Sequence, residues 1–280
     1  MLRTALALIA CVLASAPSQA QDLPGEVPVV SQCLALARDM PLPRVQYASF
    51  TPASLERGEV SIRFVGHSTF RIESASGVVI ATDFAGWAGN GRVPDIVTMN
   101  RAHSSHYTDN PDPEITHVLR GWGTDGNPFA SHSLVVEDVL VRNVTTDIRQ
   151  SWSFDGEVAN RRPNDNSIFI FEIDGLCIGH LGHLHHALGP EHKAKIGRLD
   201  ILMVPVDGRY TMNVDTMIDV IRDLRSSIVL PMHYFGPTTL QRFLTGMEVH
   251  FPVEIQQSPQ IRVSLNSLPP SPKVIVLPGY

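Results

Sequence analysis

Short apolar runs of strand length recur between residues 60 and 230 and constrain the fold more than any other feature. In the first run Val60, Ile62 and Phe64 alternate with polar residues, which is the two-residue period of a strand with one buried face. Later runs repeat this length between turn residues. We predict strands at residues 60–64, 70–72, 78–80, 95–98, 139–144, 168–173, 176–178, 201–204 and 228–230.

Helical patterns are fewer. Residues 214–224 place apolar side chains on one face, with Asn213 as the N-cap, and a second helix is predicted at residues 238–247. Strand-rich halves interleaved with a few helices predict two sheets with helices outside, in one domain over residues 58–280. The proline-rich segment 21–57 is predicted to be an N-terminal extension lying across that domain, with a short helix at residues 29–38.

The composition is that of an ordinary globular protein. The 280 residues are 43% hydrophobic and 18% charged, which excludes disorder, collagen-like repeats and a coiled coil. The net charge is −6, and no run of Lys and Arg exceeds two residues. This pattern argues against nucleic acid as the main partner.

The first twenty residues have the pattern of a secretory signal peptide cleaved after Ala20. Arg3 precedes an apolar stretch from Ala5 to Ala14, and small residues precede the cleavage site. The stretch is shorter than the roughly 20 residues of a membrane span. An alternative is a lipoprotein, since the residues ending at Cys11 resemble a lipobox. Either reading predicts a periplasmic or secreted protein.

Export would leave two cysteines, Cys33 and Cys177. They could pair in an oxidising compartment. The sequence does not show whether they lie close together, so we treat both as structural.

The histidines follow predicted strands. His103 and His106 come after the strand at 95–98, four histidines lie within residues 180–186, and His233 follows the strand at 228–230. Loops at one rim of a sheet can bring such separated side chains together. Neutral imidazole is the commonest metal ligand, so these clusters predict a metal site.

Five segments stand out along the chain. They are Gly-His-Ser-Thr-Phe-Arg-Ile at residues 66–72, Val-Ile-Ala-Thr-Asp at 79–83, His-Leu-Gly-His-Leu at 180–184, Val-Pro-Val-Asp-Gly at 204–208 and Pro-Met-His-Tyr at 231–234. In this order they resemble the metallo-β-lactamase superfamily, and within it the ascorbate-6-phosphate lactonase-like, metal-dependent hydrolases. The resemblance implies an α/β (α+β) fold, a four-layer αβ/βα sandwich, with a metal site at one rim of the sheets.

The chain departs from the family's His-x-His-x-Asp-His motif. Over residues 101–106 the resemblance places Arg101 at the first histidine and Ser105 at the aspartate, and only His103 and His106 match. The family's bridging aspartate falls on His183 and its final histidine on His233. The family's middle histidine is absent from residues 145–160, where Asp155 is a candidate to replace it.

The charge of such a site favours one metal ion. The family's usual centre sets two divalent ions against two carboxylates, and neutral imidazoles offset none of that charge. Two ions about 3.5–4 Å apart would repel each other in a partly dry cleft. We therefore predict a single divalent transition metal, zinc first, with manganese or iron as alternatives. The predicted ligands are His103, His106, His183 and His233.

The predicted reaction is hydrolysis of a small ester, lactone or phosphoester by metal-activated water. Arg101 would take the place of the second metal and hold an anionic oxygen of a small-molecule substrate. His185, His186 and Asp109 are the candidate proton acceptors. His180 and Asp83 could orient the ligands, although Asp83 could equally end a strand in a turn, and Asp207 is treated as structural.

Two other classes of protein fit the same residues. An all-histidine site suits iron or copper in a redox protein. A non-catalytic metal-binding protein could also keep this fold. The sequence does not indicate an oligomeric state.

Overall fold

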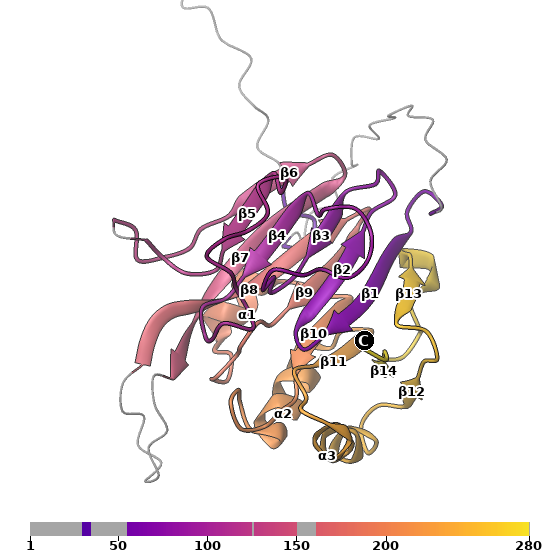
Figure 1. Ribbon diagram of the computed structural model, residues 1–280. Coiled ribbons are helices and arrows are strands. Elements are labelled where there is room, and N and C mark those ends of the chain that lie inside the picture. The colour runs from indigo at the N-terminus through magenta and orange to yellow at the C-terminus, as the bar shows by residue number, and fades with distance from the viewer. Residues whose placement is uncertain (1–29, 35–54, 125, 150–160, 280) are drawn as a thin grey trace, which may run out of the picture.

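The computed structural model describes residues 30–34, 55–124, 126–149 and 161–279, and these residues form two facing β-sheets (Figure 1). The first sheet has six strands. Its order is β13 (Gln260–Val263), β1 (Val60–Gly66), β2 (Thr69–Glu73), β3 (Val79–Ala81), β4 (Ile96–Met99) and β5 (His117–Arg120).

The second sheet has eight strands and a parallel centre, in which β9, β10, β11 and β14 run in one direction. Its order is β12 (Val253–Ile255), β14 (Lys273–Val276), β11 (Ile228–Met232), β10 (Ile201–Pro205), β9 (Leu176–His180), β8 (Arg161–Ile173), β7 (Val139–Arg149) and β6 (Ser133–Val136).

The main core lies between the sheets. Ile62 and Phe70 of the first sheet and Phe171 and Met203 of the second belong to one buried cluster. The next residue along β10, Leu202, belongs to the cluster on the other face of the second sheet. Burial on both faces explains why β10 has no polar alternation.

Three helices contribute to that outer cluster: α1 (Pro190–Ile196), α2 (Val214–Leu224) and α3 (Pro237–Met247). Figure 1 shows α2 and α3 beside the second sheet. The Asn213 side chain accepts a hydrogen bond from Thr216 N, so it caps α2 as predicted. Over β3 and β4 the first sheet is instead covered by a loop cluster that includes Phe84 and Ile115.

All the predicted strands are confirmed within a residue or two at most ends, although β7 and β8 run further than expected. The helices predicted at residues 214–224 and 238–247 are also confirmed. The sequence patterns missed β5, β6, β12, β13, β14 and α1. Residues 32–34 form a turn where a helix was predicted over 29–38. Residues 29 and 35–38 of that predicted helix lie outside the described residues, and so do the predicted signal peptide and Asp155.

A disulfide joins Cys33 to Cys177 of β9 across 144 residues of sequence. The Glu172 carboxylate accepts hydrogen bonds from the backbone N–H of Cys33 and of Gln32, and it pairs with Arg142. The segment 30–34 is therefore attached to the second sheet by the disulfide and by hydrogen bonds to the carboxylate of a buried ion pair. Among the residues described, no helix has the length and apolarity needed to span a membrane.

Candidate metal centre

The predicted histidines meet at one rim, where strands of both sheets end. His67 lies in the turn between β1 and β2, and Asp83 lies just after β3. His103 and His106 follow β4, His183 follows β9, Asp207 follows β10 and His233 follows β11. The parallel strands β9, β10 and β11 end at this rim, and so do β3 and β4 of the facing sheet.

Two fully buried histidines each contact a buried carboxylate. His106 Nδ1 lies 2.5 Å from Asp83 Oδ2, and His233 Nδ1 lies 3.1 Å from Asp207 Oδ1. Burial acts to raise the pKa of Asp83, but His180 and His106 lower it below its ordinary value. Burial also acts to raise the pKa of Asp207, but hydrogen bonds from His233 and Thr211 lower that pKa well below its ordinary value. Both aspartates are therefore ionised and accept a hydrogen bond from a histidine Nδ1.

With Nδ1 of each ring directed at an aspartate, the Nε2 atoms of His106 and His233 face each other. His106 Nε2 and His233 Nε2 are 3.1 Å apart. In neutral rings that donate from Nδ1, both Nε2 atoms carry lone pairs, and two facing lone pairs repel unless a cation lies between them. Tetrahedral zinc with Zn–N bonds of about 2.0–2.1 Å sets its nitrogens roughly 3.3 Å apart. Carboxylates behind metal-binding histidines are also the usual support of such sites. The donor set therefore fits a divalent metal.

Four histidines offer ring nitrogens that all lie within 4.8 Å of one another: His67, His103, His106 and His233. No role was predicted for His67, although its segment carries part of the family resemblance. His67, Asp83 and His233 all have positive φ angles, 51°, 42° and 55°, and His233 N donates to His67 O at 2.6 Å. Left-handed backbone at such residues is uncommon and collects at functional sites.

Ser105, at the position of the missing aspartate, connects two of these rings. Its hydroxyl lies 2.8 Å from His67 Nε2 and 2.7 Å from His103 Nδ1. With a single proton it donates to one ring and accepts from the other. Ser105 therefore positions two imidazoles but adds no negative charge.

His183 lies beside the four-histidine group and contacts it through His103, with 3.0 Å between the two Nε2 atoms. His183 Nδ1 is 2.6 Å from His185 Nε2, and His185 Nδ1 accepts from Arg149 N at 2.6 Å. A neutral His185 must then carry its proton on Nε2, from which it donates to His183 Nδ1. Because His183 Nδ1 accepts, a neutral His183 carries its own proton on Nε2. In this arrangement His183 donates to His103 Nε2, so neither of these two atoms has a free lone pair until a metal displaces the hydrogen bond.

The rings at the edge of the cluster are held neutral. Burial, and then the nearby His233, lower the pKa of His67 to about 3, and burial with the nearby His106 lowers the pKa of His103 to about 4. Burial also takes the pKa of His183 well below its ordinary value. The pKa of His185 falls to about 3 through burial and the nearby Arg149. Neutral imidazole is the form that binds metal.

The three predicted catalytic residues lie in different surroundings. Arg101 Nη2 pairs with Asp165 at 3.0 Å, and its guanidinium lies 5.6 Å from the centre of the Trp122 ring. Its Nε is buried with no hydrogen-bond partner among the described residues. Asp109 is exposed, and in the described part of the chain no hydrogen bond joins it to the histidine cluster. Both ring nitrogens of His185 are engaged, so it positions His183.

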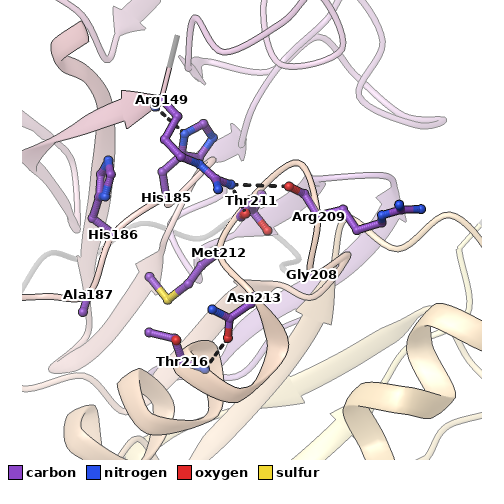
Figure 2. Close-up of a pocket in the computed structure, with 10 residues that line it drawn as sticks. All are labelled: Arg149, His185, His186, Ala187, Gly208, Arg209, Thr211, Met212, Asn213 and Thr216. Carbon is purple, nitrogen blue, oxygen red and sulfur yellow. Dashed lines mark hydrogen bonds between the residues drawn. The ribbon is translucent and has the colours of Figure 1, made fainter. Parts of the chain in front are cut away.

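A cavity of about 320 Å³ lies beside His185 (Figure 2). Arg149, His186 and the start of α2 line it, and no carboxylate is among the lining residues that the structure describes. His186 Nε2 is buried there with no partner among the described residues. His180 is further from the cluster: its Nε2 donates to Ser68 O at 2.8 Å, because its Nδ1 accepts from Gly182 N.

Two facing sheets with a histidine cluster at their shared rim define a class of metal-binding α/β sandwich. A family profile described as "Beta-lactamase superfamily domain" matches residues 61–233. The chain belongs to this superfamily. It is also similar to the UPF0173 metal-dependent hydrolase TV0864 of Thermoplasma volcanium, at 26% identity over 196 residues that cover 63% of this chain and 84% of the relative. A UPF0173 metal-dependent hydrolase of Myxococcus xanthus is 24% identical over 71% of this chain and 79% of its own length.

Solved structures show the same fold. A protein of Thermotoga maritima, assigned to the Zn-dependent hydrolases of the metallo-beta-lactamase superfamily, superposes with a TM-score of 0.55 at 24% identity. The match covers 78% of this chain and 98% of that one. A metal-dependent hydrolase of Parabacteroides distasonis gives 0.52 at 16% identity, over 68% of this chain and 88% of that chain. The predicted single-domain sandwich is thereby confirmed.

Proposed function

We propose that this protein is an exported, single-metal hydrolase that acts on a small ester, lactone or phosphoester. The observation that carries the proposal is the pair of carboxylate–histidine contacts, Asp83 with His106 and Asp207 with His233. They direct two lone pairs to one point from two different sheets. The names of the similar proteins, metal-dependent hydrolases, support the same class of reaction.

Charge balance supports one metal ion. Asp83 and Asp207 are buried and ionised, so they supply two negative charges directly behind the ligands. One divalent ion is neutralised by them, whereas two would leave two positive charges uncompensated next to neutral imidazoles. The proposed ligands are His106 and His233 with His103, whose Nε2 would bind the metal in place of the hydrogen bond from His183. His183 was also a predicted ligand, and His67 competes with it for the remaining place because of its position in the cluster.

A divalent metal held there supplies Lewis acidity and makes water a nucleophile near neutral pH. The chain's own residues orient the metal ligands and bind the substrate. The two aspartates fix the rings of His106 and His233, and Ser105 fixes those of His67 and His103. We propose that Arg101, whose Nε has no hydrogen-bond partner in the described part of the chain, holds an anionic oxygen of the substrate. His186, whose buried Nε2 lies in the adjacent cavity and has no partner among the residues described, is a stronger candidate proton acceptor than the exposed Asp109.

Two observations support export. The N-terminal sequence has the pattern of a signal peptide, and Cys33 and Cys177 form a disulfide, which persists in oxidising compartments. Cell fractionation and mass measurement of the mature N-terminus test this part of the proposal. A protein found in the cytoplasm with Met1 intact would refute it.

The test of function combines metal analysis with a substrate panel, on protein purified without a histidine tag. The panel holds an aryl acetate, an aryl phosphodiester and a lactone, the last because the sequence segments resemble the lactonase-like branch. About one zinc or manganese per chain with turnover of any of these supports the proposal. Bound iron or copper with redox cycling, or metal binding without turnover, would refute it in favour of a redox or a non-catalytic protein.

Single variants then decide the fourth ligand. His67→Ala and His183→Ala are compared for metal retained after dialysis. Greater loss in His67→Ala assigns the ligand to the turn between β1 and β2, and greater loss in His183→Ala restores the original prediction. Arg101→Ala should weaken substrate binding without loss of metal. Loss of metal in that variant would show that Arg101 belongs to the metal site.

A further inference from the structure

Two exposed aromatic side chains stand at the open edge of the histidine cluster. Phe235 and Tyr210 are 59% and 54% exposed, and their ring centres are 5.3 Å apart, edge to face. The Phe235 ring also lies 5.4 Å from that of His233 and 5.9 Å from that of His67. We call Phe235 and Tyr210 the aromatic rim.

The backbone that carries the rim is built from the same contacts that orient the metal ligands. Asp207, which fixes His233, also accepts a hydrogen bond from Tyr210 N at 2.5 Å. Phe235 follows His233 by two residues, and His233 N is tied to His67 O. Tyr234 between them packs against the core near Phe64, which directs the next side chain outward. The rim is therefore held at a fixed position beside the cluster.

The rim offers apolar surface where the cluster opens to solvent. His106 and His233 are fully buried, whereas His67 and His103 are only partly buried, so a substrate reaches the cluster on their side. Phe235 contacts His67 on that side. Two aromatic rings in mutual contact form a surface that gains free energy when an apolar group covers it.

We propose that the aromatic rim binds an apolar acyl or aryl group of the substrate, next to the bond that is hydrolysed. This inference rests on the proposed hydrolase function and makes it more specific, because it selects esters of apolar acids over small polar esters. Phe235 and Tyr210 are then specificity residues.

The test is a series of p-nitrophenyl esters from two to six acyl carbons. A fully buried methylene raises kcat/KM about fourfold. A rim that covers one side of the acyl chain should supply about half of that free energy, which is about twofold per methylene. We expect kcat/KM of the wild-type protein to rise about twofold per methylene, or about 16-fold over the series. In Phe235→Ala/Tyr210→Ala the series should be nearly flat, whereas Phe235→Leu, which restores apolar surface, should keep most of the slope.

Val249→Ala is the control, since Val249 is 78% exposed beyond the far end of α3 from Phe235. It should keep the full slope. Metal content and melting temperature of each variant show that it is folded and loaded. A double variant with the wild-type slope would overturn the inference, as would a flat wild-type series.

Failure of the proposed function gives a different result. If the wild-type protein hydrolyses neither these esters nor the lactone and phosphodiester of the panel, the proposed function fails, and the rim is tested by calorimetric binding of alkylphosphonates of one to six carbons to zinc-loaded protein. Affinity that rises with chain length in the wild type and not in the double variant supports the rim. Affinity independent of chain length overturns it.

Discussion

The contact between Asp83 and His106 provides the sharpest test of the metal site, through the substitution Asp83→Asn. Asp83 Oδ2 accepts from His106 Nδ1, and Oδ1 accepts from Asn100 Nδ2 at 2.8 Å. Asn100 cannot turn to suit a new partner, because its own Oδ1 accepts from Ser167 N at 2.7 Å. An asparagine at position 83 has only one acceptor oxygen. Its amide must therefore face either Asn100, donor to donor, or His106.

An amide that faces His106 reverses the tautomer of that ring. His106 Nδ1 would then accept, and its proton would move to Nε2, the atom that faces His233. Loss of such a supporting carboxylate lowers metal affinity by about 10- to 100-fold, or about 1.4–2.7 kcal/mol. We therefore expect the zinc Kd of Asp83→Asn, measured by competition with a chromogenic chelator, to rise by that factor.

A thermal assay gives an independent measure, since it compares each variant with and without metal. At a metal concentration of 100 times the wild-type Kd, binding stabilises the wild type by about 2.7 kcal/mol, and a 30-fold weaker site by about 0.9 kcal/mol. At about 2–4 °C per kcal/mol for a domain of this size, the metal-induced rise in Tm falls from about 5–11 °C to about 2–4 °C.

The control for Asp83→Asn is Asp200→Asn. Asp200 is also buried and accepts from Cys177 N, but it lies at the start of β10, the opposite end from the cluster. The Asp200→Asn variant should be less stable than the wild type and should keep the wild-type affinity for metal. A Kd of Asp83→Asn within twofold of the wild type, with an unchanged rise in Tm, would refute the assignment of ionised Asp83 as the support of His106.

Three further predictions concern the metal ligands, the neutral His185 ring and the disulfide. His106→Ala and His233→Ala should each abolish metal retention while the exposed His250→Ala keeps it, as measured by elemental analysis; equal retention in all three would contradict the site. Because the folded-state pKa of His185 is about 3 and its ordinary value is 6.5, the unfolded chain binds the extra proton. Stability of the metal-free protein should therefore be complete above pH 6.5 and decrease as the pH falls toward 3, with a weaker dependence in His185→Asn; a denaturation midpoint independent of pH over this range would show that the ring is not held neutral. Reduction of the disulfide, which closes 144 residues, should cost about 3–5 kcal/mol and lower Tm by about 6–20 °C, with no effect of reductant on Cys33→Ala; equal sensitivity of both proteins would contradict this role.

The strands that sequence analysis found are those whose side chains repeat a simple pattern. β1 alternates because one face is covered by the facing sheet, and β10 is apolar throughout because both faces are covered. β12 and β13, both at sheet edges, have mostly half-buried or exposed residues, so no apolar run marks them. β5 is similarly half-buried. Edge strands depend on pairing with a neighbour, which a local pattern does not contain.

The histidines of the site that directly follow apolar strands could be predicted from the sequence. A histidine whose position depends on the backbone conformation of a turn could not. His103, His106 and His233 were found because each comes just after an apolar run. His67 lies in a two-residue turn after β1, and its place in the cluster depends on a positive φ angle and on the hydrogen bond from His233 N. Neither is visible from the spacing of residues. The Gly-His-Ser segment was the available signal, because glycine before the histidine permits that turn.

The carboxylates of the site show why its charge was misjudged from the motif alone. The resemblance placed both expected aspartates on uncharged residues, Ser105 and His183, and this left imidazoles with no negative charge beside the metal. The structure supplies two carboxylates from Asp83 and Asp207, each one ring further from the proposed ion. Charge acts over distance, so a carboxylate behind an imidazole still neutralises a cation held in front of it. Histidine ligands backed by two ionised aspartates can therefore balance one divalent ion without any carboxylate ligand, and this argument favours a single metal more strongly than the missing motif residues do.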